Sequence, residues 1–141
     1  MKNIELLAPA GSMESLVAAI NNGADAIYLG GSKFSARAYA SNFDNETMMK
    51  AVDYAHSYGV KVYVTMNTLL KENELREALK YSGYLYEIGV DALIIQDTGL
   101  INLIQKVYPD FELHASTQMT VHNGEGALYF TEKGLKRIVL S

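Results

Sequence analysis

A short glycine-led phrase recurs four times along this chain, and it restricts the fold more than any other feature. Each copy follows a helical pattern and contains a glycine, a small or branched residue, one or two polar residues and an apolar run. The copies begin at Gly23, Gly59, Gly89 and Gly134, with starts separated by 36, 30 and 45 residues. A glycine just past a helix can take the left-handed conformation that ends it. Because the apolar run suits a strand buried on both faces, the phrase predicts a βα repeat with a parallel sheet.

The rest of the chain fits this repeat, with six strands and five helices that strictly alternate. Ser12 and Asp44 are candidate N-caps of the first two helices. The other three helices are expected at about 72–88, 99–107 and 123–133, and the last is the weakest because it starts with two glycines. The strands are expected at 4–8, 26–29, 60–66, 92–96, 111–115 and 137–140.

This order predicts an α/β fold of parallel (β/α) repeats with right-handed crossovers. Two architectures compete: an open doubly wound sheet and a (β/α)8, or TIM, barrel. A barrel needs eight strands and typically about 250 residues, whereas this chain has 141 residues and ends at Ser141, directly after a strand. We therefore expect residues 1–141 to form a single, incomplete TIM-barrel-like domain, the N-terminal fragment of a longer protein. The alternative is a complete flavodoxin-like sheet.

Composition excludes several classes of protein. The chain is 49% apolar and 20% charged, which is typical of a globular protein. Its net charge of −4 argues against strong nucleic-acid binding by this piece alone. The absence of cysteine excludes disulfides and thiolate metal sites. No signal-peptide segment and no apolar run of about 20 residues are present, so we expect a cytoplasmic protein without a membrane partner.

Polar residues collect where the predicted strands end, which is where parallel βα folds place their active sites. Asn67 follows the third strand, Gln96 and Asp97 end the fourth, and the segment from His114 to Gln118 ends the fifth. Single members have simpler explanations, since Asn67 and Asp97 are also good helix caps and His114 is also explained as a hydrogen-bonded core residue. Together, however, such convergent polar groups are costly unless they are paired or used.

Two further features of this edge concern catalysis and anion binding. The loop 30–37 offers backbone amides and two cations, so Arg37 is a candidate anion contact, although a simple turn with a solvated Lys33 also explains the sequence. A triad of Ser116, His114 and Asp97 can be drawn. Ser116 and His114 lie two apart on one strand, however, which does not guarantee the hydrogen bond between nucleophile and base. P-loop, zincin and nucleophile-elbow motifs are absent.

Three phrases of the chain carry a resemblance to a known family. They are residues 5–11 (ELLAPAG), residues 23–30 (GADAIYLG) with 34–37 (FSAR), and residues 114–119 (HASTQM) with His122-Asn123. In this order they resemble the N-terminal part of the collagenase-like peptidase family U-32, and the match runs from end to end. The resemblance implies a (β/α) barrel-like N-terminal domain in a longer protein.

The resemblance implies two kinds of activity. The family is named after members described as collagen-degrading proteases, whereas other members take part in hydroxylation of tRNA uridine, of a ribosomal RNA cytidine or of the ubiquinone ring. Those members hold an iron–sulfur cluster through cysteines that mostly lie beyond the point where this chain stops. Because this chain has no cysteine, an iron–sulfur cluster is expected only in a full-length protein, and no cofactor is expected in this chain.

We therefore favour RNA hydroxylation, with tRNA as the leading substrate, and expect this piece alone to be inactive. The cosubstrate implied by the resemblance is a small carboxylic acid. Arg37 would hold an anionic group, and His114 would donate a hydrogen bond or shuttle a proton. The catalytic candidates are His114, Ser116 and Asp97, and the substrate-binding candidates are Glu5, Arg37, Asn67, Gln96, Gln118 and His122. The alternatives are a genuine peptidase and a non-catalytic barrel module, and open sheet edges favour self-association.

Overall fold

The glycines of the repeated phrase end four of the helices, as predicted. A computed structural model describes residues 4–39 and 43–141, so residues 40–42, in the polar loop that the sequence predicts from Gly30 to Phe43, lie outside the described residues. Backbone φ is 93° at Gly23, 71° at Gly59, 88° at Gly89 and 92° at Gly134. All four values lie in the left-handed region that side-chain-bearing residues avoid. The phrase is therefore a helix stop followed directly by a strand.

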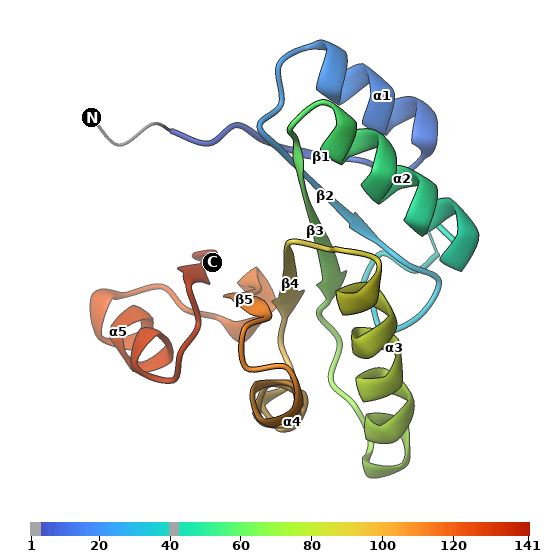
Figure 1. Cartoon of the computed structure of the whole chain (residues 1–141). Coiled ribbons are helices and arrows are strands. Elements are labelled where there is room, and N and C mark those ends of the chain that lie inside the picture. The colour runs from blue at the N-terminus through green and yellow to red at the C-terminus, as the bar shows by residue number, and fades with distance from the viewer. Residues whose placement is uncertain (1–3, 40–42) are drawn as a thin grey trace.

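The described residues contain six strands, five α-helices and two short 3₁₀ turns, in the predicted alternation (Figure 1). In chain order they are β1 (Leu7–Pro9), α1 (Met13–Asn21), β2 (Ala26–Gly30), α2 (Asn45–Ser57), β3 (Lys61–Met66), η1 (Glu72–Glu74), α3 (Leu75–Glu87), β4 (Ala92–Ile95), α4 (Thr98–Val107), β5 (Glu112–Ala115), η2 (Thr117–Met119), α5 (Gly124–Glu132) and β6 (Arg137–Ile138). Both predicted N-caps are confirmed, since the side chains of Ser12 and Asp44 accept hydrogen bonds from the first turns of α1 and α2.

The order of the strands decides between the two predicted architectures. All six strands are parallel and lie in the order β1-β2-β3-β4-β5-β6, so each pairs with its neighbour in the chain. A doubly wound sheet reverses its strand order at a switch point, which places helices on both faces. Here the helices follow the convex side of a curled sheet (Figure 1). The fold is therefore an incomplete (β/α) barrel.

The sheet of this half-barrel carries one apolar cluster on each of its two faces. The larger cluster lies between the sheet and the helices and includes Leu16, Val52 and Leu93. A smaller cluster on the other face contains Ala26, Tyr63, Ala92 and Ile94, with Leu7 and Tyr28 packed against it. Because neighbouring residues of a strand point to opposite faces, this second set marks the barrel interior.

Several element bounds differ from the prediction. The first strand is Leu7–Pro9, not 4–8, and therefore includes Pro9, which the predicted bounds leave out. Ala10 on the next position donates its N–H to Tyr28 of β2, so Pro9 faces the open edge of the sheet, where a missing N–H is tolerated. The sixth strand is only Arg137–Ile138, two residues shorter than expected. Residues 72–74 of the third predicted helix form the 3₁₀ turn η1.

The burial predicted for the third helix was partly wrong. The helical spacing of the sequence predicts one buried stripe of Leu75, Leu79, Ser82 and Tyr86, but the buried residues are Ala78, Ser82, Gly83 and Leu85. Leu75, Leu79 and Tyr86 are only partly buried against the core. Ser82 lies against β3, with its hydroxyl 3.5 Å from the sulfur of Met66, whereas Gly83 faces Tyr108 at the end of α4, where a Cβ would collide with the tyrosine hydroxyl.

The aspartates of the repeated phrase have a structural role that the sequence pattern did not reveal. The carboxylate of Asp25 accepts the backbone N–H of Leu6 at 2.7 Å, and that of Asp91 accepts the N–H of Val62 at 2.7 Å. In both cases the aspartate precedes a strand and bonds to the start of the neighbouring strand, at the residue before β1 for Asp25 and at the second residue of β3 for Asp91. These side chains satisfy backbone donors at the amino-terminal edge of the sheet, where the ladder has not yet begun.

Candidate functional site

A pocket of about 380 Å³ lies at the carboxyl ends of the strands, inside the curl of the sheet. Its lining combines the apolar inner face with polar strand ends: Leu7, Tyr28, Ala36, Arg37, Thr65, Asn67, Ile94, Ser116, Thr117, Gln118 and Val139. Four predicted site residues therefore meet here, namely Arg37, Asn67, Ser116 and Gln118. A larger hollow of about 990 Å³ lies on the outer wall between α2 and α3, and it contains none of the predicted residues.

The loop after β2 is fixed beside this pocket by two hydrogen bonds, of which the first is buried. The hydroxyls of Ser35 and Thr65 lie 2.8 Å apart, and the side chain of Asn67 accepts the N–H of Ala36 at 3.0 Å. Phe34 at the turn of the loop has a φ of 61°, a strained value for a residue with a side chain. The two bonds hold Ser35 and Ala36, which follow Phe34, and thereby place the next residue, Arg37, in a defined position.

Arg37 lies over the aromatic ring of Tyr28 at the mouth of the pocket. Its guanidinium carbon is 5.2 Å from the ring centroid, and its Nη2 donates to the Tyr28 hydroxyl at 3.4 Å. No ion pair of Arg37 is found among the described residues, in contrast to Lys33 of the same loop, which pairs with Glu77. An arginine that rests on an aromatic ring without a carboxylate partner is well suited to bind an anion.

Ser116 supplies a second donor to the pocket. Its hydroxyl oxygen accepts hydrogen bonds from Asn67 Nδ2 and from the backbone N–H of Gln118, both at 3.3 Å. A hydroxyl has two acceptor lone pairs and one hydrogen, so these bonds leave the hydrogen as the group that Ser116 offers to a ligand. Asn67 links both halves of the site, because its oxygen holds the β2 loop while its nitrogen holds Ser116.

The other predicted residues lie outside the pocket lining. Gln96 donates to the carbonyl of Gln118, and His122 lies 3.0 Å from the carbonyl of Thr120 through its Nδ1. Asp97 caps α4 by accepting the N–H of Leu100 at 2.8 Å, and it also accepts the N–H of Leu70. Its side chain therefore has the capping role that the sequence offered as the simpler explanation.

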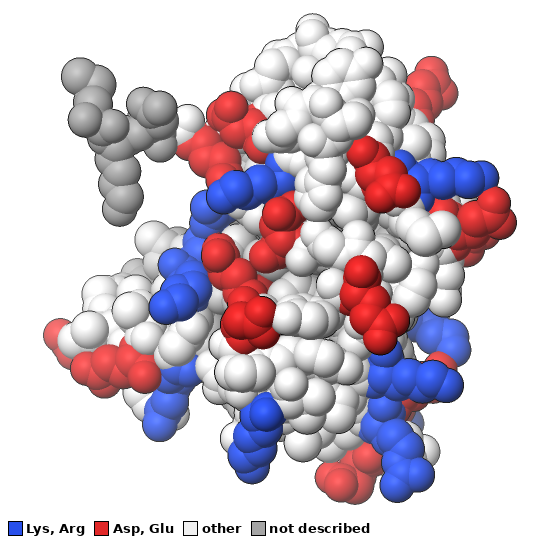
Figure 2. All heavy atoms as spheres, in the orientation of Figure 1, with Lys and Arg blue, Asp and Glu red and all other residues white. Residues whose placement is uncertain are grey.

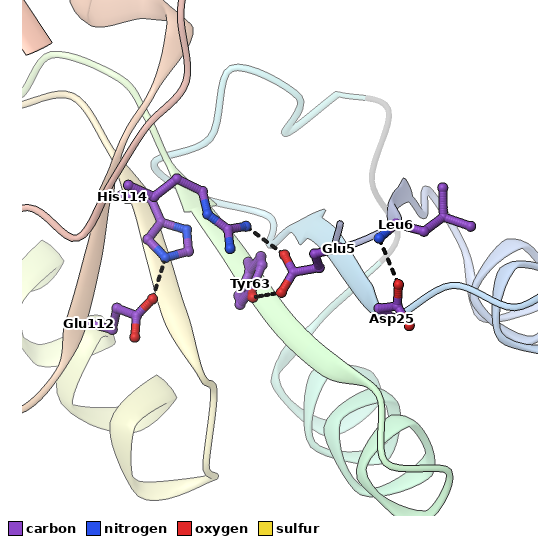
Figure 3. A network of polar contacts seen from close by, with 7 residues as sticks. Glu5, Leu6, Asp25, Tyr63, Glu112 and His114 are labelled. Carbon is purple, nitrogen blue, oxygen red and sulfur yellow. Dashed lines mark hydrogen bonds and ion pairs between the residues drawn. The ribbon is translucent and has the colours of Figure 1, made fainter. Parts of the chain in front are cut away.

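Glu5 belongs to a polar network that also includes Tyr63 (Figure 3), and it does not line the pocket. Its carboxylate accepts from Arg137 at 2.6 Å and from the Tyr63 hydroxyl at 2.9 Å, and the Arg137 hydrogen bond holds the Glu5 pKa below its usual value. Burial, followed by the bond to Glu5, raises the pKa of Tyr63 to about 12. Glu5 therefore tethers the segment before β1 to the last strand.

His114 lies in the same interior and pairs with Glu112, not with Asp97. Its Nε2 is 2.7 Å from the Glu112 carboxylate, and the ring is fully buried. Its pKa is lowered by burial, which outweighs the opposing effect of the Glu112 hydrogen bond. Because Ser116 bonds to Asn67 and Asp97 caps a helix, the drawn triad is not hydrogen-bonded in this structure.

Sequence reasoning missed Glu112, Arg137 and Tyr28. Glu112 and His114 are two apart on one strand and therefore share a face, which was a usable signal. Arg137 meets Glu5 across 132 residues of sequence, and no local pattern announces such a contact. Tyr28 stood within an apolar run and was interpreted only as strand.

The chain's own residues do not fit the iron–sulfur cluster that the resemblance implies. Such clusters are held by cysteine thiolates, occasionally with histidine, and the sequence contains no cysteine. Residues 4–39 and 43–141 also contain no group of three acidic, histidine or cysteine side chains placed to hold a metal ion. Any cluster in a full-length protein would therefore depend on residues outside this chain.

Charges of both signs are mixed over the visible surface (Figure 2). Acidic and basic side chains alternate there without a broad field of one sign, in keeping with the small net charge of −4. The surface in this view therefore lacks the extended basic stripe by which many proteins hold a nucleic-acid backbone.

A curled parallel sheet with a polar pocket at the carboxyl ends of its strands defines a (β/α)-barrel domain. Residues 11–141 match peptidase family U32, and the chain belongs to that family. The resemblance drawn from the three phrases is thereby confirmed. A solved structure of a U32 peptidase superposes with a TM-score of 0.77 over 99% of this chain and 60% of its own, at 17% identity, and a phosphonomutase-like structure does so with a TM-score of 0.70. These two similarities concern the fold.

Curated relatives from bacteria carry names that refer to RNA. The chain is 44% identical over 138 residues to the 23S rRNA 5-hydroxycytidine C2501 synthase of Escherichia coli. The alignment covers 98% of this chain and 20% of that protein. The chain is 38% identical over 141 residues to tRNA hydroxylation protein P1 of Bacillus subtilis, in an alignment that covers 99% of this chain and 33% of that protein. A relative in Methanocaldococcus jannaschii, 36% identical, is named an uncharacterized protease and is covered to 34%.

The chain thus spans about a fifth to a third of the length of the first relatives it matches. Relatives named for RNA hydroxylation range from 34% to 44% identity, and the archaeal relative with the protease name, at 36%, lies within that range. The protease name agrees with the name of the family. In the part of the chain that the structure describes, no helix has the length and apolar character needed to cross a bilayer.

Proposed function

We propose that a protein carrying this chain takes part in the hydroxylation of RNA, with tRNA as the leading substrate, and that this half-barrel supplies part of the substrate pocket. The observation that carries the proposal is the pocket at the strand ends, which brings Arg37, Asn67 and Ser116 together. The relatives named for tRNA and rRNA hydroxylation support the choice of reaction.

The chemistry of the pocket supports an acidic ligand. Arg37 offers a cation without a carboxylate partner among the described residues, and Ser116 offers a hydroxyl hydrogen. Donors that converge in a partly enclosed site favour a group that only accepts hydrogen bonds. We propose a small carboxylic acid as the cosubstrate that binds here, with its carboxylate on Arg37.

The remaining parts of the proposal concern a full-length protein. An iron–sulfur cluster held outside this chain would supply electron-transfer chemistry, and a cytoplasmic location agrees with an RNA substrate. We also propose that this chain, when expressed alone, self-associates through the sheet edges at β1 and β6, since unpaired edge strands are templates for pairing. Light scattering across a dilution series tests this point, and a strictly monomeric chain contradicts it.

A peptidase activity lacks the corresponding support from geometry. A serine nucleophile needs a base within hydrogen-bond reach, and the hydroxyl of Ser116 instead accepts from Asn67 and from the Gln118 backbone. Casein or gelatin cleavage by the parent protein that is lost on Ser116→Ala would restore the peptidase hypothesis.

The test is a comparison of modified nucleosides in tRNA and rRNA from a strain that lacks the parent gene. We expect a hydroxylated pyrimidine to disappear and to return with the wild-type gene. Arg37→Ala should restore it poorly, whereas the matched control Lys33→Ala should restore it fully, because Lys33 belongs to the same loop but pairs with Glu77 away from the pocket. An unchanged nucleoside profile in the deletion strain would reject the proposal.

A further inference from the structure

The protonation of one buried histidine can be derived from its partners. His114 is fully buried, and its Nε2 lies 2.7 Å from Oε1 of Glu112. An ionised carboxylate can only accept hydrogen bonds. The hydrogen between these two atoms therefore belongs to Nε2, and the other ring nitrogen, Nδ1, carries a lone pair as long as the ring is neutral.

The surroundings of the ring favour this neutral form. Burial is the largest influence on the His114 pKa and lowers it, and the positive charge of Arg137 lowers it further. Glu112 and, more weakly, Glu5 act in the opposite direction. The edge of the ring packs on Tyr63, with the two ring centroids 4.8 Å apart. The net effect is a pKa below the usual value, so the ring is neutral at pH 7.

The lone pair on Nδ1 has no hydrogen-bond partner among the described residues. Buried polar atoms are nearly always paired, and an exception calls for an explanation. This exception lies beside the proposed site, since His114 is level with Ile94 of β4 and precedes Ser116 by two positions on the same face. Both Ile94 and Ser116 line the pocket, so His114 belongs to the side-chain layer directly beneath it.

We propose that Glu112 is a positioning residue that holds His114 in the Nε2–H form, so that His114 faces the interior of the half-barrel as a hydrogen-bond and proton acceptor through Nδ1. A neutral imidazole fixed by a carboxylate in this way accepts a proton at its free nitrogen. Its use in a reaction rests on the proposed function above, whereas the fixed protonation of the ring does not. Of the two roles expected from the sequence, an acceptor at Nδ1 agrees with the proton shuttle and not with hydrogen-bond donation.

The experiment is long-range ¹H–¹⁵N NMR of the three histidine rings in the 141-residue chain. We expect His114 to carry its proton on Nε2 from pH 7 upward, as a protected signal that exchanges slowly with water. His122 is the internal reference, because its Nδ1 lies 3.0 Å from the carbonyl oxygen of Thr120 and must donate to it. The two rings should therefore show opposite protonated nitrogens in one spectrum.

Two substitutions separate the hydrogen bond from the charge of Glu112. Glu112→Gln keeps an acceptor oxygen, so the protected Nε2–H signal should remain while the His114 pKa falls further for want of the negative charge. Glu112→Ala removes the acceptor, so the protected signal should be lost as well. Circular dichroism and thermal unfolding of both variants establish that they are folded, which the half-exposed position of Glu112 favours.

A proton on Nδ1 of His114, a doubly protonated ring at pH 7, or an unchanged Nε2–H signal in Glu112→Ala would each overturn the positioning role. In the parent gene, Glu112→Ala should lower the yield of the hydroxylated nucleoside more than Glu112→Gln does, and equal yields from both variants and the wild type would overturn the catalytic use of His114. If no RNA hydroxylation is found at all, the function proposed above fails while the NMR result on Glu112 still stands.

Discussion

The clearest quantitative prediction concerns Gly59, the helix-ending glycine between α2 and β3. Its φ is 71°, and a Cβ built on it would meet no atom within 4 Å. A substitution to alanine therefore adds no steric conflict with neighbours and isolates the energy of the left-handed backbone. That energy is about 1–2 kcal/mol for a residue with a side chain, so Gly59→Ala should lower the free energy of unfolding by this amount. Gly59→Asn should lower it less, because asparagine tolerates this conformation better.

Gly124 is the matched control for this substitution. It is the first residue of α5, a Cβ there would also meet nothing within 4 Å, and its φ lies outside the left-handed range. Gly124→Ala should leave stability unchanged or raise it by up to about 1 kcal/mol, since alanine reduces the freedom of the unfolded chain. The two variants therefore differ in backbone conformation and share the open surroundings.

The assay is urea unfolding followed by circular dichroism, with thermal unfolding as a second measure. For a chain of this length, 1–2 kcal/mol corresponds to a Tm lower by roughly 3–8 °C. Equal stability of Gly59→Ala and Gly124→Ala would mean that the left-handed backbone does not require glycine at position 59. The inference from the repeated glycine to a helix end would then be refuted.

Three further predictions concern buried or paired polar groups. Burial raises the pKa of Tyr81 to about 12. Because this pKa exceeds the unfolded value near 10, the free energy of unfolding should fall as pH rises from about 10 toward about 12. Urea unfolding of Tyr81→Phe should show a smaller fall over the same pH range. The Arg137 hydrogen bond lowers the Glu5 pKa, so this bond should stabilise the fold above about pH 4.5 and lose that effect on acidification. Glu5→Gln should lower the free energy of unfolding by about 1–3 kcal/mol at pH 7. The variant should also be less sensitive to acid in the same urea unfolding assay. Ser35→Ala removes a buried hydroxyl partner of Thr65 and should cost about 1–2 kcal/mol by thermal unfolding, a loss that Ser32→Ala on the exposed part of the loop should not reproduce.

Much of the architecture could be predicted because it depends on local rules. Helix stops at glycine, N-caps such as Ser12, and apolar runs buried on both faces are all encoded within a few residues. The first strand was misplaced because the edge position of Pro9 depends on which side of the strand faces a neighbour, and this is a tertiary property. The same holds for α3, where burial of Ser82 and Gly83 depends on the neighbours Met66 and Tyr108 from other elements.

The site was predictable to the extent that strand ends define it. Arg37, Asn67, Ser116 and Gln118 were found because parallel strands bring their carboxyl ends to one edge, and the structure places all four at one pocket. Glu5 was predicted to bind substrate, but it does not line this pocket, and its carboxylate accepts a hydrogen bond from Arg137. Contacts of that kind depend on the curvature of the whole sheet, which no short stretch of sequence specifies.

The strand order also bears on how this chain reaches its folded state. Since every strand pairs with the next one along the chain, each pairing closes a loop of only one helical unit, and low sequence separation of contacts favours fast folding. A nascent chain could add one unit after another as it leaves the ribosome, with each new strand finding its neighbour already in place. The Glu5–Arg137 bond is different, because it waits until 132 further residues have been made. That bond would therefore be among the last contacts to form, and it would report that the curl of the sheet is complete.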